Sequence, residues 1–186
     1  MLKEIKRQFI HLALGSCFIF LVPILSVTQL FFLVLLLLGI GLIFSFMIKK
    51  RILIPFFSYL VETVERKHER FIPGQGSFMF FLGLIVLLLV FQNQLIVLGA
   101  LIVVVFGDSV ATIVGLTIGK HRLLNNRTLE GSVAGIVAAF IFLSILFPPN
   151  IAFLVAFTGM LAEFLPVNDN LSIPIVSGMV LKLLLI

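Results

Sequence analysis

Three ionisable residues stand inside long apolar stretches of this sequence: His11, Asp108 and Glu163. A charged residue at the centre of a membrane helix costs about 2.5–3.5 kcal/mol on insertion scales, and such residues usually mark a function. The stretches offer the two carboxylates no basic partner except at their ends. We therefore interpret the two acids as part of a divalent-cation site or an acid–base site.

His11 shares one face of the first apolar stretch with Glu4 and Arg7, at positions i, i+3 and i+7. Glu4 and Arg7 are also typical of an anchor whose charged ends reach the membrane surface. An anchor does not account for His11, although a single buried histidine is more often a packing residue than a ligand.

Asp108 is followed by small residues at helical spacing, so that Thr112, Gly115 and Gly119 fall on its face of a helix. Small residues four positions apart allow two membrane helices to pack closely. Close packing would hold the carboxylate in place, so both interpretations can apply. Two successive stretches carry such ridges: Ala111, Gly115 and Gly119, then Gly131, Gly135 and Ala139.

A basic segment leads into the next predicted helix, with Lys120 and Arg127 before Glu130, Gly131 and Ser132. Basic side chains beside a helix start favour phosphate, because free N–H groups and the helix dipole point at it. The segment is equally well explained as a basic loop that membrane proteins keep in the cytoplasm.

A carboxylate between two carboxamides, Asn168-Asp169-Asn170, begins the last apolar stretch. Oxygen ligands of this kind suit a hard cation such as Mg²⁺. The alternative is that Asp169 or Ser172 caps the helix, with a proline in its first turn.

The composition indicates which elements position these residues. Of 186 residues, 61% are hydrophobic and 11% charged, and the mean hydropathy is +1.30, whereas soluble domains have about 25% charged residues. We predict an all-α, polytopic membrane protein forming a single transmembrane domain over residues 1–186. About seven spans of about 20 residues fit this length: approximately 8–25, 29–48, 77–92, 95–118, 131–147, 150–165 and 171–186.

The basic residues indicate the orientation of these spans. Twelve of the thirteen Lys and Arg residues lie near the N-terminus or in the loops 49–76 and 119–130, Lys182 being the exception. Such residues accumulate in cytoplasmic loops, so the N-terminus and both loops are predicted to be cytoplasmic, in the cytoplasmic membrane or the endoplasmic reticulum. The net charge of +5 is then no signal of nucleic-acid binding. Asp108 and Glu163 both fall about 20 Å from the outer ends of their spans, in the cytoplasmic half.

The long loop 49–76 has its own pattern. Phe57, Leu60, Val61 and Val64 recur at helical spacing opposite acidic and basic residues. This pattern predicts a helix lying in the headgroup layer. Such a helix is either an interfacial linker or a lid or lipid entrance.

Taken in order, five motifs resemble the CTP-dependent polyprenol kinase family, which includes dolichol, phytol and yeast-type diacylglycerol kinases. The resemblance spans nearly the whole chain, and the order of the motifs is more specific than any one of them. They are Glu4-x-x-Arg7-x-x-x-His11; Pro73-Gly74-x-Gly76; Gly107-Asp108-Ser109 with Gly115 and Gly119-Lys120; Arg127-Thr128-Leu129-Glu130-Gly131-Ser132; and Asn168-Asp169-Asn170 with Ile173-Pro174.

The resemblance implies a Mg²⁺-dependent transfer of the γ-phosphoryl group of CTP to a lipid alcohol in the bilayer. Asp108 and Asp169, with Asn168 and Asn170, would hold the metal. Glu163 or His11 would orient or deprotonate the alcohol.

The same resemblance implies that Lys120, Arg127 and Arg7 contact the nucleotide, with Glu130, Gly131 and Ser132 shaping the phosphate loop. One departure concerns the first helix, because the family commonly has Arg-Lys before its histidine and this chain has Arg7-Gln8.

Three alternatives remain open. The first is a cytidylyltransferase of the phosphatidate or CDP-archaeol type, which makes a CDP-lipid from a phosphorylated lipid. The second is diacylglycerol as the acceptor of a kinase. The third is a small ion-coupled transporter with Asp108 and Glu163 as its relay, which would need acids spread through the bilayer.

Overall fold

The computed structural model describes residues 2–50 and 75–185, and within them the chain is helical, without strands. The predicted all-α class is therefore confirmed. The amphipathic helix predicted in loop 49–76 lies outside the described residues. Of the motif at 73–76, the first two residues lie outside them as well. The elements are α1 (Leu2–Leu21), α2 (Val27–Lys49), α4 (Gln75–Val90), α5 (Gln94–Ile102), η1 (Val103–Asp108), α6 (Ser109–Thr117), η2 (Leu124–Asn126), α7 (Leu129–Leu143), α8 (Pro149–Leu161), η3 (Ala162–Phe164) and α9 (Asp169–Leu184).

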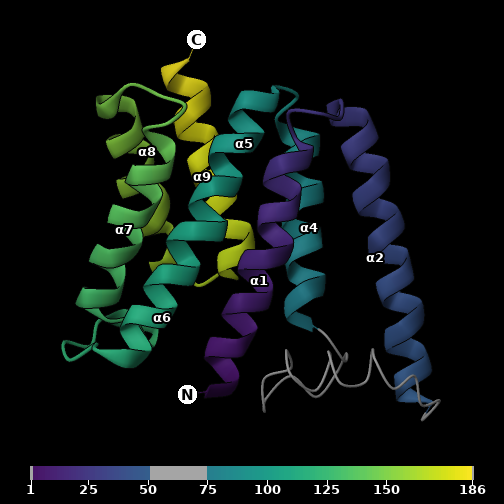
Figure 1. Ribbon diagram of the computed structural model, residues 1–186, viewed down its shortest axis with the longest axis horizontal. Helices are drawn as coiled ribbons and strands as arrows, with labels where there is room; N and C mark the ends of the chain where they lie inside the picture. The colour runs from purple at the N-terminus through teal and green to yellow at the C-terminus, as the bar shows by residue number, and fades with distance from the viewer. Residues whose placement is uncertain (1, 51–74, 186) are drawn as a thin grey trace.

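The helices stand side by side and run alternately up and down, so that the two chain ends lie at opposite ends of the bundle (Figure 1). Each of the seven predicted apolar stretches corresponds to one rod in this arrangement, α5, η1 and α6 forming a single rod. The end that holds the N-terminus also holds the α6–α7 connection and the start of α9. We call it the basic end, because the described Lys and Arg residues other than Lys182 lie there.

Within residues 2–50 and 75–185, two helices are long and apolar enough to cross a membrane, Val27–Lys49 and Gln94–Thr117. The apolar helices Gly76–Val90, Leu129–Leu143 and Pro149–Phe164 are shorter. A helix of 15 residues rises only about 22 Å, less than a hydrocarbon core of about 30 Å. The seven membrane spans expected from the sequence thus correspond to seven described rods. Two of these rods are long and apolar enough to cross a membrane by themselves.

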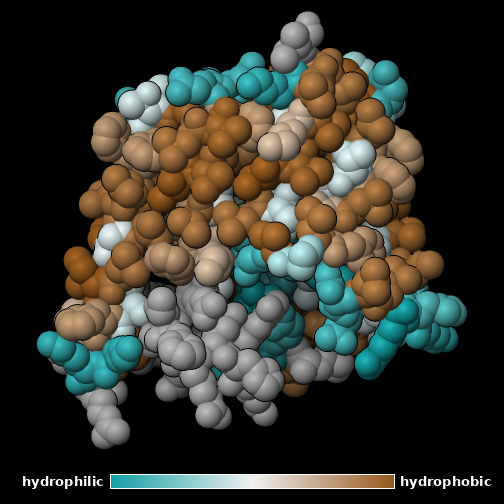
Figure 2. Space-filling view, turned by 180° about the vertical axis from the view of Figure 1, so that it is seen from behind, coloured by the Kyte–Doolittle hydropathy of each residue, from teal (hydrophilic) through white to brown (hydrophobic). Residues whose placement is uncertain are grey.

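The exterior of the bundle is apolar between two polar ends. Figure 2 shows a broad hydrophobic band with hydrophilic residues above and below it. On α2 the exposed residues include Phe32 and Ile43, each 62% exposed. Soluble monomers rarely expose apolar surface on this scale, so the exterior suits a lipid environment.

A π-helix interrupts the long central rod. Residues Val103–Asp108 form η1 between the α-helical segments α5 and α6, and Asp108 is its last residue. One-turn π-helices inside α-helices are rare and frequently lie at functional sites. The hydrophobic pattern alone did not predict this change of helix type.

Small residues let α6 and η1 approach α7, as the sequence predicted. A Cβ on Gly135 would lie 2.8 Å from the backbone oxygen of Gly107 and 2.8 Å from Cβ of Ala111. A Cβ on Gly131 would lie 2.6 Å from the backbone oxygen of Ala111. These distances leave no room for a side chain, so the glycines fix the spacing between the helices.

The start of α9 differs from the predicted cap. Asn168 is the N-cap, and its side-chain oxygen accepts a hydrogen bond of 3.1 Å from the N–H of Asn170. Asp169 and Ser172, the caps considered from the sequence, lie inside the helix. The carboxylate of Asp169 is thereby free of the capping role.

We expect Gly135→Ala to lower the free energy of unfolding by about 1–3 kcal/mol, because its Cβ would meet backbone and buried side chains that cannot move away. The measurement is thermal unfolding of the purified protein in detergent. Gly39→Ala on α2 is the matched control, because nothing lies within 4 Å of a Cβ at that position. Equal melting temperatures for the two variants would contradict the packing argument.

Candidate active site

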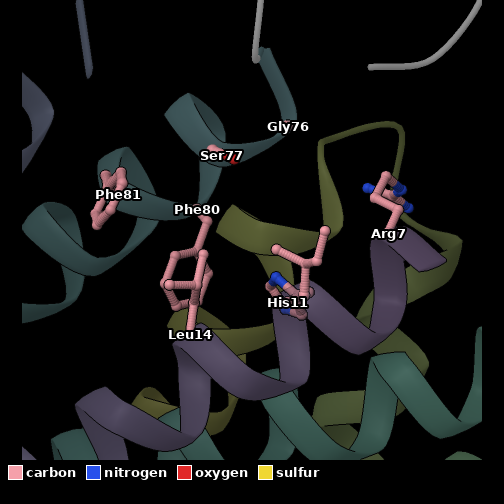
Figure 3. A pocket seen from close by; sticks show the side chains of 8 residues that line it. Arg7, His11, Leu14, Gly76, Ser77, Phe80 and Phe81 are labelled. Carbon is pink, nitrogen blue, oxygen red and sulfur yellow. The ribbon is translucent and has the colours of Figure 1, made fainter. Parts of the chain in front are cut away.

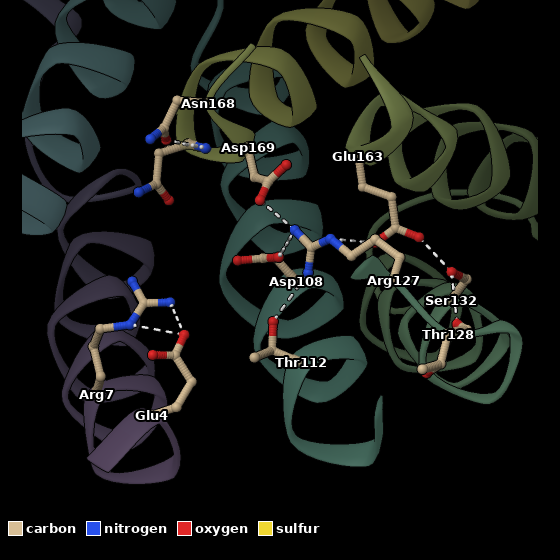
Figure 4. Close-up of polar contacts among 11 residues, drawn as sticks. Glu4, Arg7, Asp108, Thr112, Arg127, Thr128, Ser132, Glu163, Asn168 and Asp169 are labelled. Carbon is tan, nitrogen blue, oxygen red and sulfur yellow. Dashed lines mark hydrogen bonds and ion pairs between the residues drawn. The ribbon is translucent and has the colours of Figure 1, made fainter. Parts of the chain in front are cut away.

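One arginine gathers three carboxylates at the basic end of the bundle (Figure 4). Nη2 of Arg127 donates a hydrogen bond of 3.2 Å to Oδ1 of Asp108 and another to Oδ2 of Asp169. Its Nε lies 3.6 Å from Oε2 of Glu163. Nη1 donates to Oγ1 of Thr112 at 3.3 Å. We call Arg127, Asp108, Asp169 and Glu163 the carboxylate cluster.

Each member of the cluster comes from a different segment. Asp108 ends η1, Glu163 lies in η3 beyond α8, and Asp169 is the first residue of α9. Arg127 comes from the connection between α6 and α7. The cluster therefore ties four segments together at one level of the bundle.

The α6–α7 connection is folded tightly enough to aim Arg127 inward. The N–H of Leu123 donates to the backbone oxygen of Arg127 at 2.7 Å. Asn125 and Asn126 have φ of 55° and 59°, in the left-handed region that asparagine tolerates better than most residues. The side chain of Asn125 donates to the backbone oxygen of Phe164 at 3.1 Å, which joins the connection to the segment carrying Glu163.

Glu163 is the most deeply buried acid of the cluster, with its side chain 1% exposed. The hydroxyl of Ser132 donates to Oε1 of Glu163, and it also lies 3.1 Å from the backbone oxygen of Thr128. Thr128 caps α7, because its hydroxyl accepts from the N–H of Gly131 at 3.2 Å. Ser132 and Arg127 thus hold Glu163 from two sides.

The charges within the cluster do not balance. Three carboxylates face one guanidinium, a formal excess of two negative charges when all are ionised. Burial alone would lower the pKa of Arg127, but the charges of Asp108, Asp169 and Glu163 outweigh it and raise the pKa. Arg127 is therefore held in its charged form. The excess negative charge of the cluster favours the binding of a further cation.

The residues of the cluster fit a Mg²⁺ ion that shares its coordination with a nucleotide. Oxygens of Asp108 and Asp169 converge on the same atom, Nη2 of Arg127, so a cation placed between them meets both. No group of three or more His, Cys, Asp or Glu side chains within residues 2–50 and 75–185 could hold a metal ion. One or two carboxylates suffice for Mg²⁺ when phosphate oxygens and water complete its shell.

The predicted ligand Asn168 has another contact, and Asn170 packs against α4 through its backbone. The side-chain oxygen of Asn168 caps α9. The backbone oxygen of Asn170 lies so close to α4 that a Cβ on Gly83 would overlap it. The structure therefore brings together Asp108 and Asp169 from the predicted metal set, while Asn168 caps the helix that Asp169 begins. The metal-binding roles of Asn168 and Asn170 stay predictions.

The residues predicted to bind phosphate fall into two groups. Arg127, Gly131 and Ser132 line a hollow of about 370 Å³ beside Thr112 and Glu163. Lys120 is exposed and outside that hollow. The predicted phosphate ligand Arg127 thus contacts the predicted metal ligands directly, an ion pair that the sequence argument had set aside because the spans hold no base.

Glu130 contacts the loop that was predicted to bind phosphate. It accepts hydrogen bonds from the backbone N–H of His121 at 3.3 Å and lies 2.7 Å from Nδ1 of His121. A hydrogen bond from its own N–H, followed by the bond to His121, lowers the pKa of Glu130 to about 2. Glu130 therefore stays ionised and fastens the loop without touching the cluster.

His11 and Arg7 lie apart from these contacts, on α1. His11 packs edge-on against Phe80 with ring centroids 4.9 Å apart. Arg7 pairs with Glu4 at 2.5 Å. Both line a second hollow, between α1 and α4 (Figure 3). The structure thus separates the predicted site into a carboxylate cluster and a pocket beside it.

Thr128 appears above only as part of a motif, and its role as the N-cap of α7 was not predicted. The signal that could have revealed it is a threonine three residues before Gly131, the spacing of a helix cap. No local signal links Ser132 to Glu163, since the two lie 31 residues apart.

Comparisons with known proteins identify a family that this chain matches. A family model described as the cytidylyltransferase family matches residues 2–181. The chain is 29% identical over 185 residues to an uncharacterized protein of Methanocaldococcus jannaschii, covering 97% of this chain and 94% of that protein. No solved structure matches the chain.

We expect Arg127→Gln to lower the free energy of unfolding by about 3–5 kcal/mol, because it leaves buried carboxylates without their counter-charge. Thermal unfolding in detergent measures the effect. Mg²⁺ should recover part of the loss, since a divalent cation can neutralise the same carboxylates. Arg122→Gln, at an exposed position of the same loop, is the control. An Arg127→Gln protein as stable as the wild type would show that the cluster needs no counter-charge.

Proposed function

The chain belongs to the cytidylyltransferase family, and from this premise we propose that it is a membrane enzyme that transfers the cytidylyl group of CTP to a phosphorylated lipid. The product is a CDP-lipid and the leaving group is pyrophosphate. The family match supports this reaction, which the sequence left as an alternative, and nothing in the comparisons points to a polyprenol kinase.

The observation that carries the proposal is the convergence of two carboxylates and one arginine on a single point. Asp108 and Asp169 would hold Mg²⁺, which neutralises the charge of the triphosphate and orients it. Arg127 would then exchange its carboxylate partners for phosphate oxygens, for which its planar guanidinium is well suited. Glu163 and Ser132 would keep Arg127 at the edge of the hollow.

The reaction is balanced without a general base. An oxygen of the lipid phosphate attacks the α-phosphorus of CTP, and the bond to the β-phosphate oxygen breaks. A phosphate monoester with a second pKa of about 6 is already ionised at neutral pH, so the attacking oxygen has no proton to lose. A kinase, in contrast, must take a proton from an alcohol.

This difference changes the role proposed for Glu163. In a kinase Glu163 would have to accept that proton, yet here its Oε1 accepts a hydrogen bond from Ser132 and its Oε2 lies 3.6 Å from Arg127. A carboxylate held in this way suits a positioning residue. Cytidylyl transfer therefore requires no proton transfer to Glu163.

We also propose that the seven rods span the membrane, with the basic end in the cytoplasm. The apolar exterior and the two helices of sufficient length support this placement. The short rods would be accommodated by local thinning of the bilayer. The described acids all lie toward one end, which disfavours a transporter that needs access from both sides.

Labelled CTP tests the reaction. We expect purified protein with Mg²⁺ and a lipid phosphate to move label from the α position of CTP into the lipid, with release of pyrophosphate. Neutral lipid alcohols serve as the comparison acceptors. Label passing from the γ position to an alcohol would overturn the proposal and establish the kinase.

The role of Asp108 is tested by Asp108→Asn, which keeps the shape of the side chain but removes its charge. We expect transfer from CTP to fall at least about a hundredfold, as loss of a ligand or its support does in other metal sites. Ser144→Ala, at an exposed position on the opposite end of the bundle, should retain most of the activity. Full activity of Asp108→Asn would remove this residue from the metal site.

A further inference from the structure

The pocket between α1 and α4 is separate from the carboxylate cluster and has a mixed lining. The empty space at the pocket, counted together with its opening to the outside, is about 380 Å³. Arg7, His11 and Ser77 give it a polar side, and apolar residues form the rest of its wall (Figure 3). These apolar residues are Ile10, Leu14, Phe80 and Phe81.

The polar side of the pocket has the features of an anion site. It lies at the start of α4, where the helix dipole favours a negative charge. Arg7 reaches this helix start, since a Cβ on Gly76 would lie 3.6 Å from Nη1 of Arg7. Ser77 adds a hydroxyl in the first turn. A phosphate placed here meets a hydroxyl, a helix N-terminus and Nη1 of Arg7, whose Nε and Nη2 donate to Glu4.

His11 provides an independent indication of a ligand. Its Nε2 is fully buried and has no hydrogen-bond partner within the described part of the chain. Leaving a buried polar atom unpaired is unfavourable. A group that enters the pocket and accepts or donates a hydrogen bond at Nε2 would remove this cost.

The apolar side of the pocket reaches the outside of the bundle. Leu14 is 44% exposed, while Phe80 is 4% exposed. The wall therefore leads from a buried ring to the lipid-facing surface. A ligand with a charged head and an apolar chain fits both parts, whereas a free nucleotide fits only the head.

The pocket lies at the level of the carboxylate cluster. Helix α1 and the central rod formed by α5, η1 and α6 run antiparallel and touch at Gly15 and Val105. A Cβ on Gly15 would lie 2.4 Å from Cγ2 of Val105. His11 is one turn from Gly15 and Asp108 is three residues from Val105, both toward the basic end. His11, which lines the pocket, is therefore at the same level of the bundle as Asp108 in the cluster.

We propose that this pocket binds the phosphate monoester of the acceptor lipid, with His11, Arg7 and Ser77 around the phosphate and the apolar chain along Leu14 and Phe81. The inference rests on the proposed function for the identity of the acceptor. Its binding chemistry does not depend on CTP, so it can be tested without the reaction.

The test is equilibrium binding of a radiolabelled short-chain lipid phosphate to detergent-solubilised protein, without CTP. We expect Ser77→Leu and His11→Gln to weaken binding at least about tenfold, because each removes a contact to a charged group. The neutral lipid of the same chain length and inorganic phosphate should compete poorly. Ser144→Leu, at an exposed position on the opposite end, is the matched control and should bind as the wild type does.

Two further outcomes separate the pocket from the reaction. With CTP present, Ser77→Leu should raise KM for the lipid phosphate and leave KM for CTP unchanged. Binding that survives in Ser77→Leu and His11→Gln but disappears in Arg127→Gln would place the phosphate at the cluster and overturn the inference. If the wild type forms no CDP-lipid yet binds lipid phosphate through His11, the proposed function fails and the pocket stands.

Discussion

The arrangement of the basic end depends on one unbalanced charge interaction. Arg127 is the common partner of Asp108, Asp169 and Glu163, which come from three different helical segments. Buried carboxylates repel one another and lose hydration, so they stay together only around a positive charge. A single guanidinium meets part of this demand. The remaining negative charge makes the same place suitable for a divalent cation and for the triphosphate that accompanies it.

The helix packing explains how this charge cluster can be built within an apolar bundle. Gly107, Ala111 and Gly135 bring η1, α6 and α7 so close that the α6–α7 connection can turn back toward the bundle. The π-helix ends at Asp108 and sets the direction in which its carboxylate leaves the rod. Neither feature is stable alone, because the glycines add no apolar contact and the π-helix is a poor local geometry. Packing across the rods and the contacts of Arg127 stabilise both.

Much of this fold can be predicted from the sequence because membrane helices consist of long runs of apolar residues. The seven stretches and the small-residue ridges both correspond to observed features. The π-helix and the cap at Asn168 do not follow, because they depend on packing rather than on residue type. The capping residue was placed one or more positions too late, since aspartate and serine cap helices about as well as asparagine does.

The site was predicted in part for a similar reason. Depth along a helix can be counted from the sequence, and this count placed Asp108 and Glu163 at the same level. The partner of both lies in a loop, and its separations of 19 residues from Asp108 and 42 from Asp169 leave no periodic signal. The argument that the spans hold no base was true of the spans, but it overlooked a loop arginine that turns inward.

The change from phosphoryl to cytidylyl transfer also reassigns His11. A kinase would need a base near the acceptor hydroxyl, and both His11 and Glu163 were candidates for that role. A lipid phosphate brings its own ionised nucleophile, so no proton has to be removed and neither residue is needed as a base. Glu163 then remains with Arg127 and Ser132, while His11, whose Nε2 is buried without a partner in the described part of the chain, lines the neighbouring pocket. A water-soluble nucleotide can reach the cluster from the basic end, and a lipid can reach the pocket sideways between α1 and α4, so the two substrates need not share an entrance. The pocket and the cluster lie at one level of the bundle, just beyond the contact of α1 with the central rod at Gly15 and Val105, toward the basic end.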